Sequence, residues 1–146
     1  MKRKTKTKKV KRKRRKHSSK LTTTQNRLDR KWSLLVRAVG ECEVCGKTNR
    51  LNAHHLIGRG DLKCRWNLDN GVCLCVSCHR FNRFLSAHGA VGSSMVAVHR
   101  FLNWLEKNKP DQWRWYLDNM DKIVAPKNVD YDYWETYLDS NELPGF

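Results

Sequence analysis

Hydrophobic and polar positions divide the chain into helical ends and a strand-like middle. Near the N-terminus, apolar residues recur every three or four positions, which predicts an amphipathic helix. These residues are Leu28, Trp32, Leu35, Val36 and Val39. One of the threonines at 22–24 is expected to cap the start of this helix, and Gly40 suits its end. Two short apolar runs, RLNAHHLI at 50–57 and NGVCLC at 70–75, predict a hairpin with a long, basic connection.

The chain after the hairpin is helical in pattern. The stretch VSCHRFNRFLSAHG predicts a helix that begins near Val76 and ends at Gly89. Ser93 or Ser94 can cap the next helix, and Pro110 opens another. Each of these two helices and a last segment is expected to bury one face. The first helix would bury Val98, Phe101, Leu102 and Leu105, and the second Trp113, Tyr116, Leu117 and Met120. The last segment would bury Tyr131, Trp134, Tyr137 and Leu138. A hairpin among helices makes the predicted fold class α+β.

Basic residues are concentrated at the N-terminus of this 146-residue chain, whose formal net charge is +16. Residues 1–20 hold 13 of the 30 Lys and Arg residues and no acid, whereas residues 106–146 hold nine acids and five bases. A segment this basic repels itself and buries nothing, so residues 1–22 are predicted to be a disordered tail that binds polyanions. A solubility tail and a nuclear address are the alternatives. Residues 23–146 are predicted to be one domain, with a core at about 41–89 and a helical extension at 90–146.

The sequence also bounds where the protein is expected to work. No apolar run approaches the ~20 residues that span a bilayer, and no lipidation motif or signal peptide is evident. We therefore expect no membrane partner and a cytoplasmic location. Cysteines stay reduced there, so the six in this chain are expected to bind metal rather than to form disulfides.

Four of the cysteines form two pairs with metal-ligand spacing. Cys42 and Cys45 make one Cys-x-x-Cys turn, and Cys75 and Cys78 make another after 29 intervening residues. Four thiolates on two tight turns provide the closed, tetrahedral coordination of a structural zinc ion. Four unrelated buried cysteines are the alternative. Cys73 lies outside the pairs and is expected to be a buried apolar residue.

A histidine doublet, an asparagine and a third histidine accompany these pairs. His54 and His55 end the first predicted strand, Asn70 begins the second, and His79 follows the last paired cysteine. In this order and spacing, over about residues 42–84, the chain resembles the HNH nuclease family in its zinc-containing form, and particularly the small HNH proteins of bacteriophages. The resemblance implies a zinc-tied ββα-metal (His-Me finger) core, with a flanking N-terminal helix and a helical C-terminal extension.

The resemblance also implies a role for each of these four residues. His55 is then the general base, and Asn70 holds it through a backbone or side-chain hydrogen bond. His54 and His79 are then the ligands of one catalytic divalent ion, for which Mg or Mn is expected. Many members carry a further histidine one turn later, where this chain has Arg83. Water and substrate phosphate would then complete the coordination shell.

The chemistry gives an independent reason for the doublet. Hydrolysis of a phosphodiester needs a base that activates water and a cation that stabilises charge on the phosphate. A neutral imidazole is a suitable base near pH 7, and a divalent ion on His54 and His79 disfavours protonation of His55. One histidine cannot perform both tasks, whereas two neighbours can.

Basic residues near these groups are candidates for holding substrate phosphates. They are Arg59, Lys63 and Arg65 in the hairpin connection, and Arg80 and Arg83 on one face of the helix that follows. A solvated surface would have the same composition. His88 is expected to have a surface role.

The predicted function is metal-dependent cleavage of double-stranded DNA by an HNH endonuclease, a phosphodiester hydrolase. The resemblance implies products with 5′-phosphate and 3′-hydroxyl ends. It also implies the host cytoplasm as the location if a phage encodes the chain, and phage packaging or recombination proteins as candidate partners.

Two other functional classes compete with this prediction. A zinc-stabilised nucleic-acid-binding module without catalysis would share the cysteines but would not require the histidine and asparagine set. A zinc deaminase needs a His-x-Glu and a Pro-Cys-x-x-Cys. Here Leu56 and Ile57 follow the doublet, and Leu74 rather than a proline precedes Cys75.

Overall fold

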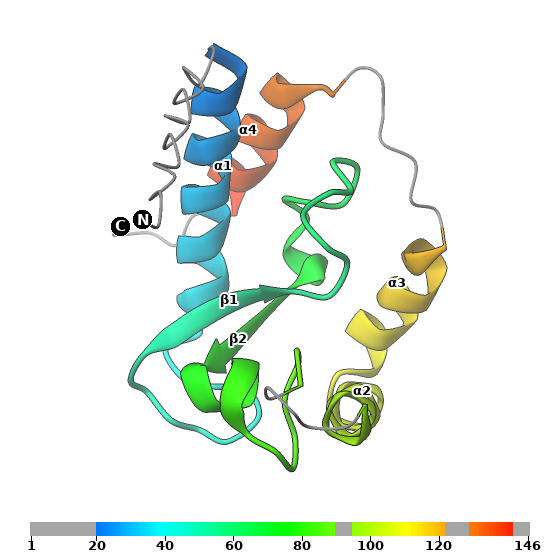
Figure 1. Ribbon diagram of the computed structural model, residues 1–146. Coiled ribbons are helices and arrows are strands. Elements are labelled where there is room, and N and C mark those ends of the chain that lie inside the picture. Colours follow the sequence, from blue (N-terminus) through cyan, green and yellow to red (C-terminus); the bar gives the residue numbers. More distant parts are fainter. Residues whose placement is uncertain (1–19, 90–94, 122–128, 142–146) are drawn as a thin grey trace, which may run out of the picture.

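A two-stranded hairpin lies between two pairs of helices (Figure 1). The computed structural model describes residues 20–89, 95–121 and 129–141. The elements are α1 (Lys20–Arg37), β1 (Leu51–His55), η1 (Leu68–Asn70), β2 (Gly71–Cys75), η2 (Ser77–Phe81), α2 (Val96–Asn108), α3 (Pro110–Met120) and α4 (Tyr131–Ser140). α1 and α4 pack together, as do α2 and α3. The predicted α+β class is confirmed, and no helix in the described ranges is long and apolar enough to cross a membrane.

Helix α1 begins earlier than its sequence pattern indicates. The structure has helix from Lys20, so the predicted cap at 22–24 is wrong because these threonines lie inside the helix. Its end agrees with the prediction: Gly40 has a φ of 83° and donates its N–H to the Arg37 carbonyl over 3.0 Å. The rest of the predicted tail, residues 1–19, lies outside the described residues, as do Ser93 and Ser94.

The hairpin is the predicted one, with Leu51 opposite Cys75 and His55 opposite Gly71. Gly71 is required by space, because a Cβ at this position would lie 2.4 Å from Val36 Cγ2 and 3.0 Å from Trp32 Cζ2. The end of the hairpin that carries His55 is therefore pressed directly against α1.

Two buried clusters hold the helices to the hairpin. One joins α1 and α4 to β2 and contains Leu28, Trp32, Val36, Trp66, Cys73, Trp134 and Leu138. The other joins α2 to β2 and contains Val72, Leu74, Phe101 and Leu105 with three paired cysteines. The inward faces predicted for α2 and α4 and the buried position of Cys73 are confirmed. The face predicted for α3 is confirmed only in part: Trp113 packs against the second cluster, but no residue of α3 is fully buried and Leu117 is 46% exposed.

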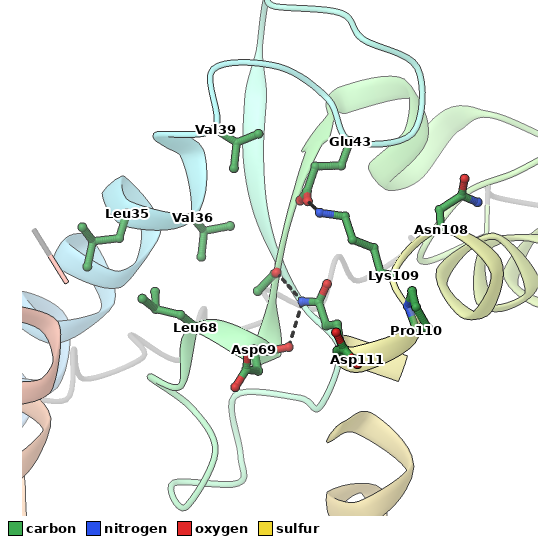
Figure 2. A pocket seen from close by; sticks show the side chains of 12 residues that line it. Leu35, Val36, Val39, Glu43, Leu68, Asp69, Asn108, Lys109, Pro110 and Asp111 are labelled. Carbon is green, nitrogen blue, oxygen red and sulfur yellow. Dashed lines mark hydrogen bonds and ion pairs between the residues drawn. The ribbon is translucent and has the colours of Figure 1, made fainter. Parts of the chain in front are cut away.

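The corner between α2 and α3 is tied to the hairpin by polar contacts (Figure 2). Lys109 forms an ion pair with Glu43. The Gln112 side chain donates to the carbonyls of Asp69 and Gly71 over 2.8 and 2.7 Å. Beside these contacts lies a hollow of about 500 Å³ whose opposite wall is aliphatic. This hollow contains none of the histidines and cysteines singled out by the sequence.

The helix predicted from Val76 to Gly89 is confirmed at its start and wrong in its length. The π-helix η2 stops at Phe81, and Asn82 is extended. The Asn82 side chain accepts hydrogen bonds from the N–H groups of Phe84 and Leu85 over 2.8 and 3.3 Å, and such local bonds compete with helix continuation. The chain then folds back along η2.

Candidate metal centre and catalytic pocket

The four paired cysteines come together as a closed group. Their sulfurs all lie within 4.8 Å of one another. The Cys45 sulfur is 3.7 Å from that of Cys75 and 3.6 Å from that of Cys78. A tetrahedral zinc ion with Zn–S bonds of ~2.3 Å requires about 3.8 Å between sulfurs. The group therefore fits a structural zinc ion, as the spacing predicts.

The local electrostatics also favour a cation at this group. Burial raises the pKa of the Cys78 thiol, and the neighbouring sulfurs raise it further. Burial likewise raises the pKa of Cys45. Several thiolates in one place are costly unless a positive ion compensates their charge.

Three histidines form a second group, which also includes a residue of η2. His54 on β1, His79 on η2 and His88 in the returning segment bring their ligand atoms within 4.8 Å of one another. Their ring centroids are 4.7–5.2 Å apart. His54 is only 6% exposed, and its Nδ1 is buried without a hydrogen-bond partner. A buried imidazole that has an unpartnered nitrogen and packs against two other histidines fits a bound divalent metal.

His88 is exposed, as expected, but its ring also belongs to the three-histidine group, which the sequence does not predict. In a continuous helix, nine residues would carry His88 about 13 Å along the axis from His79. The break at Asn82 reverses the chain instead. Ala87 then donates to the Cys78 carbonyl over 3.0 Å, and His88 donates to the His79 carbonyl over 3.1 Å. Only the Asn82 turn signal in the sequence points to this arrangement.

His55 lies beside the three-histidine group and is held on two sides. Its ring stacks on the Trp32 indole with centroids 3.7 Å apart and planes at 17°. Its Nε2 lies 2.9 Å from the Arg65 carbonyl oxygen. A carbonyl can only accept, so Nε2 carries the proton and Nδ1 keeps the lone pair. Trp32, which the sequence pattern indicates only as a core residue, thus also positions His55.

Asn70 is fully buried and holds the loop that carries this carbonyl. Its side chain accepts from the Ile57 N–H over 2.7 Å and donates to the carbonyls of Ile57 and Cys64, both over 3.0 Å. Its own carbonyl accepts from the Leu56 N–H over 3.0 Å. Asn70 therefore fixes the residues that follow His55 and the residue that precedes Arg65, and its side chain bonds to the loop rather than to His55 directly.

Arg65 has a structural contact in place of the phosphate contact predicted for it. Its guanidinium makes two hydrogen bonds to the Asp29 carboxylate, over 2.9 and 2.6 Å, and Trp66 Nε1 donates to the same group over 2.8 Å. Burial alone would raise the pKa of Asp29, but these hydrogen bonds and the positive charge of Arg65 lower it. Asp29 on α1 thus anchors the loop that holds His55.

Burial lowers the pKa of all four histidines of the pocket and so favours their neutral forms. Burial lowers the pKa of His55 and of His79 to about 4, with smaller contributions from nearby positive charges. Burial also lowers the pKa of His54 well below its ordinary value, and that of His88 below it. Neutral imidazoles can bind metal or accept a proton.

The remaining predicted basic residues differ in whether they line the hollow that contains the histidines. Arg59 and Arg80 are exposed and line a hollow of about 320 Å³ together with His54, His55, His79 and His88. Lys63 lines a different hollow. Arg83 is exposed, but it does not share a helix face with Arg80 because η2 ends between them.

Comparison with known proteins assigns no family to the chain. No protein-family model matches it, and it has no significant match among curated proteins or solved structures. Function therefore has to be argued from the cysteine group, the histidine group and His55.

Proposed function

We propose that this protein is a metal-dependent endonuclease of the HNH type that hydrolyses phosphodiester bonds of DNA. The observation that carries the proposal is the position of His55. It lies beside a three-histidine group in an open hollow, with Nε2 engaged and Nδ1 left as the basic nitrogen. A structural histidine would not need this combination of an oriented ring, a neighbouring metal-type group and solvent access.

In this proposal His54, His79 and His88 hold one divalent ion. When bound, the ion supplies positive charge for the scissile phosphate and the leaving oxygen. Three imidazoles suit Mn or later transition ions better than Mg, which prefers oxygen ligands. His88 is the third ligand in this proposal. The sequence indicates only two protein ligands, because Arg83 stands where many family members carry a further histidine.

His55 acts as the general base that takes a proton from the attacking water through Nδ1. Its low pKa keeps it unprotonated before substrate binds. A bound phosphate is negatively charged and raises the pKa of a neighbouring imidazole, which improves its proton affinity during the reaction. Trp32 and the Arg65 carbonyl prevent the ring from turning away.

Arg59 and Arg80 are placed to hold the substrate phosphates, since both are exposed and line the hollow. Arginine binds phosphate with several donors in a planar arrangement. The closed cysteine group has a structural role in this scheme.

Cleavage of supercoiled plasmid in a panel of divalent ions tests the proposal. His55→Ala is expected to lower the cleavage rate by about 10²–10⁴-fold while zinc content and DNA affinity stay the same. His99→Ala is a matched control, because His99 is exposed on α2 outside the hollow. If the parent protein binds DNA but does not cut it in the presence of any of these ions, the result would instead indicate a zinc-stabilised binding module.

A further inference from the structure

The segment after His79 exposes two large aromatic side chains. Phe81 and Phe84 are 61% and 65% exposed. Phe81 ends η2, and the turn that carries Phe84 is held by the Asn82 side chain, which accepts hydrogen bonds from the N–H groups of Phe84 and Leu85. Phenylalanine is usually buried, so two of them presented by an ordered turn indicate a contact surface.

Positive charge surrounds these rings. The sequence has no Asp or Glu from residue 70 to residue 105. Arg80 and Arg83 alternate with the phenylalanines, and both are exposed. The Arg100 guanidinium lies 3.9 Å from the centre of the Phe84 ring and donates to the Phe84 carbonyl over 3.3 Å. A surface that combines aromatic faces with arginine and lacks acids suits a polyanion with flat bases.

The same surface adjoins the histidine pocket. Arg80 lines the hollow that contains His55. Phe81, the next residue, lines a second hollow of about 370 Å³ that also contains Lys47 and Arg50. Two residues adjacent in the chain, Arg80 and Phe81, thus line the histidine hollow and a hollow with further basic side chains.

We propose that Phe81 and Phe84, with Arg80, Arg83 and Arg100, form a base-stacking surface for unpaired nucleotides next to the scissile phosphate. The inference rests on the proposed nuclease function and narrows its substrate class to DNA with single-stranded segments, such as gaps and junctions. Bases within an uninterrupted duplex have both faces covered by their neighbours, and unstacking them costs a few kcal/mol per step. Unpaired bases offer a free face to an exposed ring without that cost.

Binding measurements on two DNAs test this proposal: a duplex with a short single-stranded gap and the same duplex without it. They are made in the His55→Ala background, so that the DNA is not cut. Phe81→Ala and Phe84→Ala are each expected to weaken binding to the gapped DNA by about tenfold, and to change binding to the intact duplex less than twofold. Phe81→Trp should keep the affinity, and Phe81→Leu should lose most of it. Tyr133→Ala is the matched control, since this 55% exposed aromatic residue lies on α4.

Three outcomes would overturn the inference. Unchanged binding by both alanine variants would exclude the surface, and equal losses on both DNAs would exclude the substrate class. Full binding by Phe81→Leu would replace base stacking with a general apolar contact, such as one to a protein.

Cleavage assays on the same DNAs separate this inference from the proposed function. Binding of gapped DNA through Phe81 without cleavage in any metal would defeat the nuclease and keep the stacking surface. Equal cleavage of both DNAs, unaffected by the alanine variants, would keep the nuclease and overturn the stacking surface.

Discussion

The cysteine group and the histidine group both include a residue of η2, but they differ in burial and in the number of ligands. Three of the four cysteines are buried, and their sulfurs have the spacing of a complete tetrahedral shell. The histidine group offers only three ligands and opens into a hollow with arginines at its edge. A complete sulfur shell suits a structural ion, whereas an incomplete nitrogen shell leaves room for water and substrate. The contrast is the basis for proposing a structural role for the cysteine group and a catalytic role for the histidine group.

The two groups are nevertheless coupled through the chain. Cys78 and His79 are adjacent in sequence, and their carbonyls accept the N–H groups of Ala87 and His88. The cysteine group therefore sets the position of two of the three histidines. We expect damage to the cysteine group to spread to the histidines, but not the reverse.

The largest expected effect comes from Cys75→Ser. It should remove the zinc ion and most of the folded structure, because the binding energy of a structural zinc ion, roughly 10–16 kcal/mol in small peptides, is folding energy. Zinc content and thermal unfolding measure the effect. Cys73→Ala is the matched control: Cys73 is also buried on β2 but lies outside the group, so this variant should keep its zinc. A folded Cys75→Ser protein with full zinc content would contradict the assignment.

Removing the His88 side chain should impair cleavage and leave the zinc content and the fold intact, in contrast to Cys75→Ser. His88→Ala is expected to weaken binding of the catalytic ion at least tenfold while zinc content and melting temperature stay near those of the parent. Cleavage should be lost at low metal concentration and partly recovered with excess metal. Titration of cleavage against Mn concentration measures this, with His99→Ala as the control. Equal titration curves for the parent and His88→Ala would remove His88 from the ligand set.

The difference between the two groups also explains what the sequence could and could not predict. Both cysteine pairs sit on tight turns, so their spacing alone brings the sulfurs together. The His54-His55 doublet, Asn70 and His79 are evident in the sequence because of their order and spacing and because one histidine cannot serve as both base and metal ligand. His88 was placed outside the site because a helical pattern over 76–89 hides the reversal at Asn82.

Contacts between residues far apart in the sequence also could not be predicted from the hydrophobic and polar pattern. Arg65 and Asp29 are 36 residues apart, and nothing local indicates that they form an ion pair. The stacking of Trp32 on His55 depends on the close approach of α1 to Gly71. Leu117 has helical spacing like the buried residues of α2, but α3 lies at the edge of the fold and leaves it 46% exposed.

A smaller effect is expected from Asp29→Asn, which tests how His55 is positioned. The variant weakens both hydrogen bonds from Arg65 and removes the ion pair, so the free energy of unfolding should fall by about 2 kcal/mol at pH 7. The cleavage rate should also fall, because the Arg65 carbonyl that holds His55 loses its anchor. Denaturant unfolding and cleavage rate measure the two effects, and Asp118→Asn, at an exposed acid on α3, is the control.

The pH dependence of stability gives this prediction a second readout. The pKa of Asp29 is lower in the folded protein than its ordinary value of 3.8. The ionised carboxylate therefore stabilises the fold above about pH 4, and this contribution is lost as the pH falls through the folded pKa. The stability difference between the parent and Asp29→Asn should shrink in that range. A difference that is constant from pH 7 to pH 3 would contradict the ion pair.

The smallest effect on either group is expected from removal of the N-terminal tail. Deleting residues 1–19 leaves the start of α1 at Lys20 in place and removes 12 of the 13 basic residues counted in residues 1–20. The tail carries no acid and no residue of either group, so zinc content and the cleavage rate at saturating DNA should not change. DNA affinity should fall instead. If six tail charges contact phosphates, the slope of log K against log salt should decrease by about 5.

Affinity titrations between about 50 and 200 mM salt measure this slope for the full-length and truncated proteins. A full-length variant with the tail lysines replaced by glutamine is the matched control, because it keeps the length and removes charge. The loss should be the same for unrelated DNA sequences, since phosphate contacts position a protein without reading bases. Identical slopes for all three proteins would mean that the tail does not contact DNA.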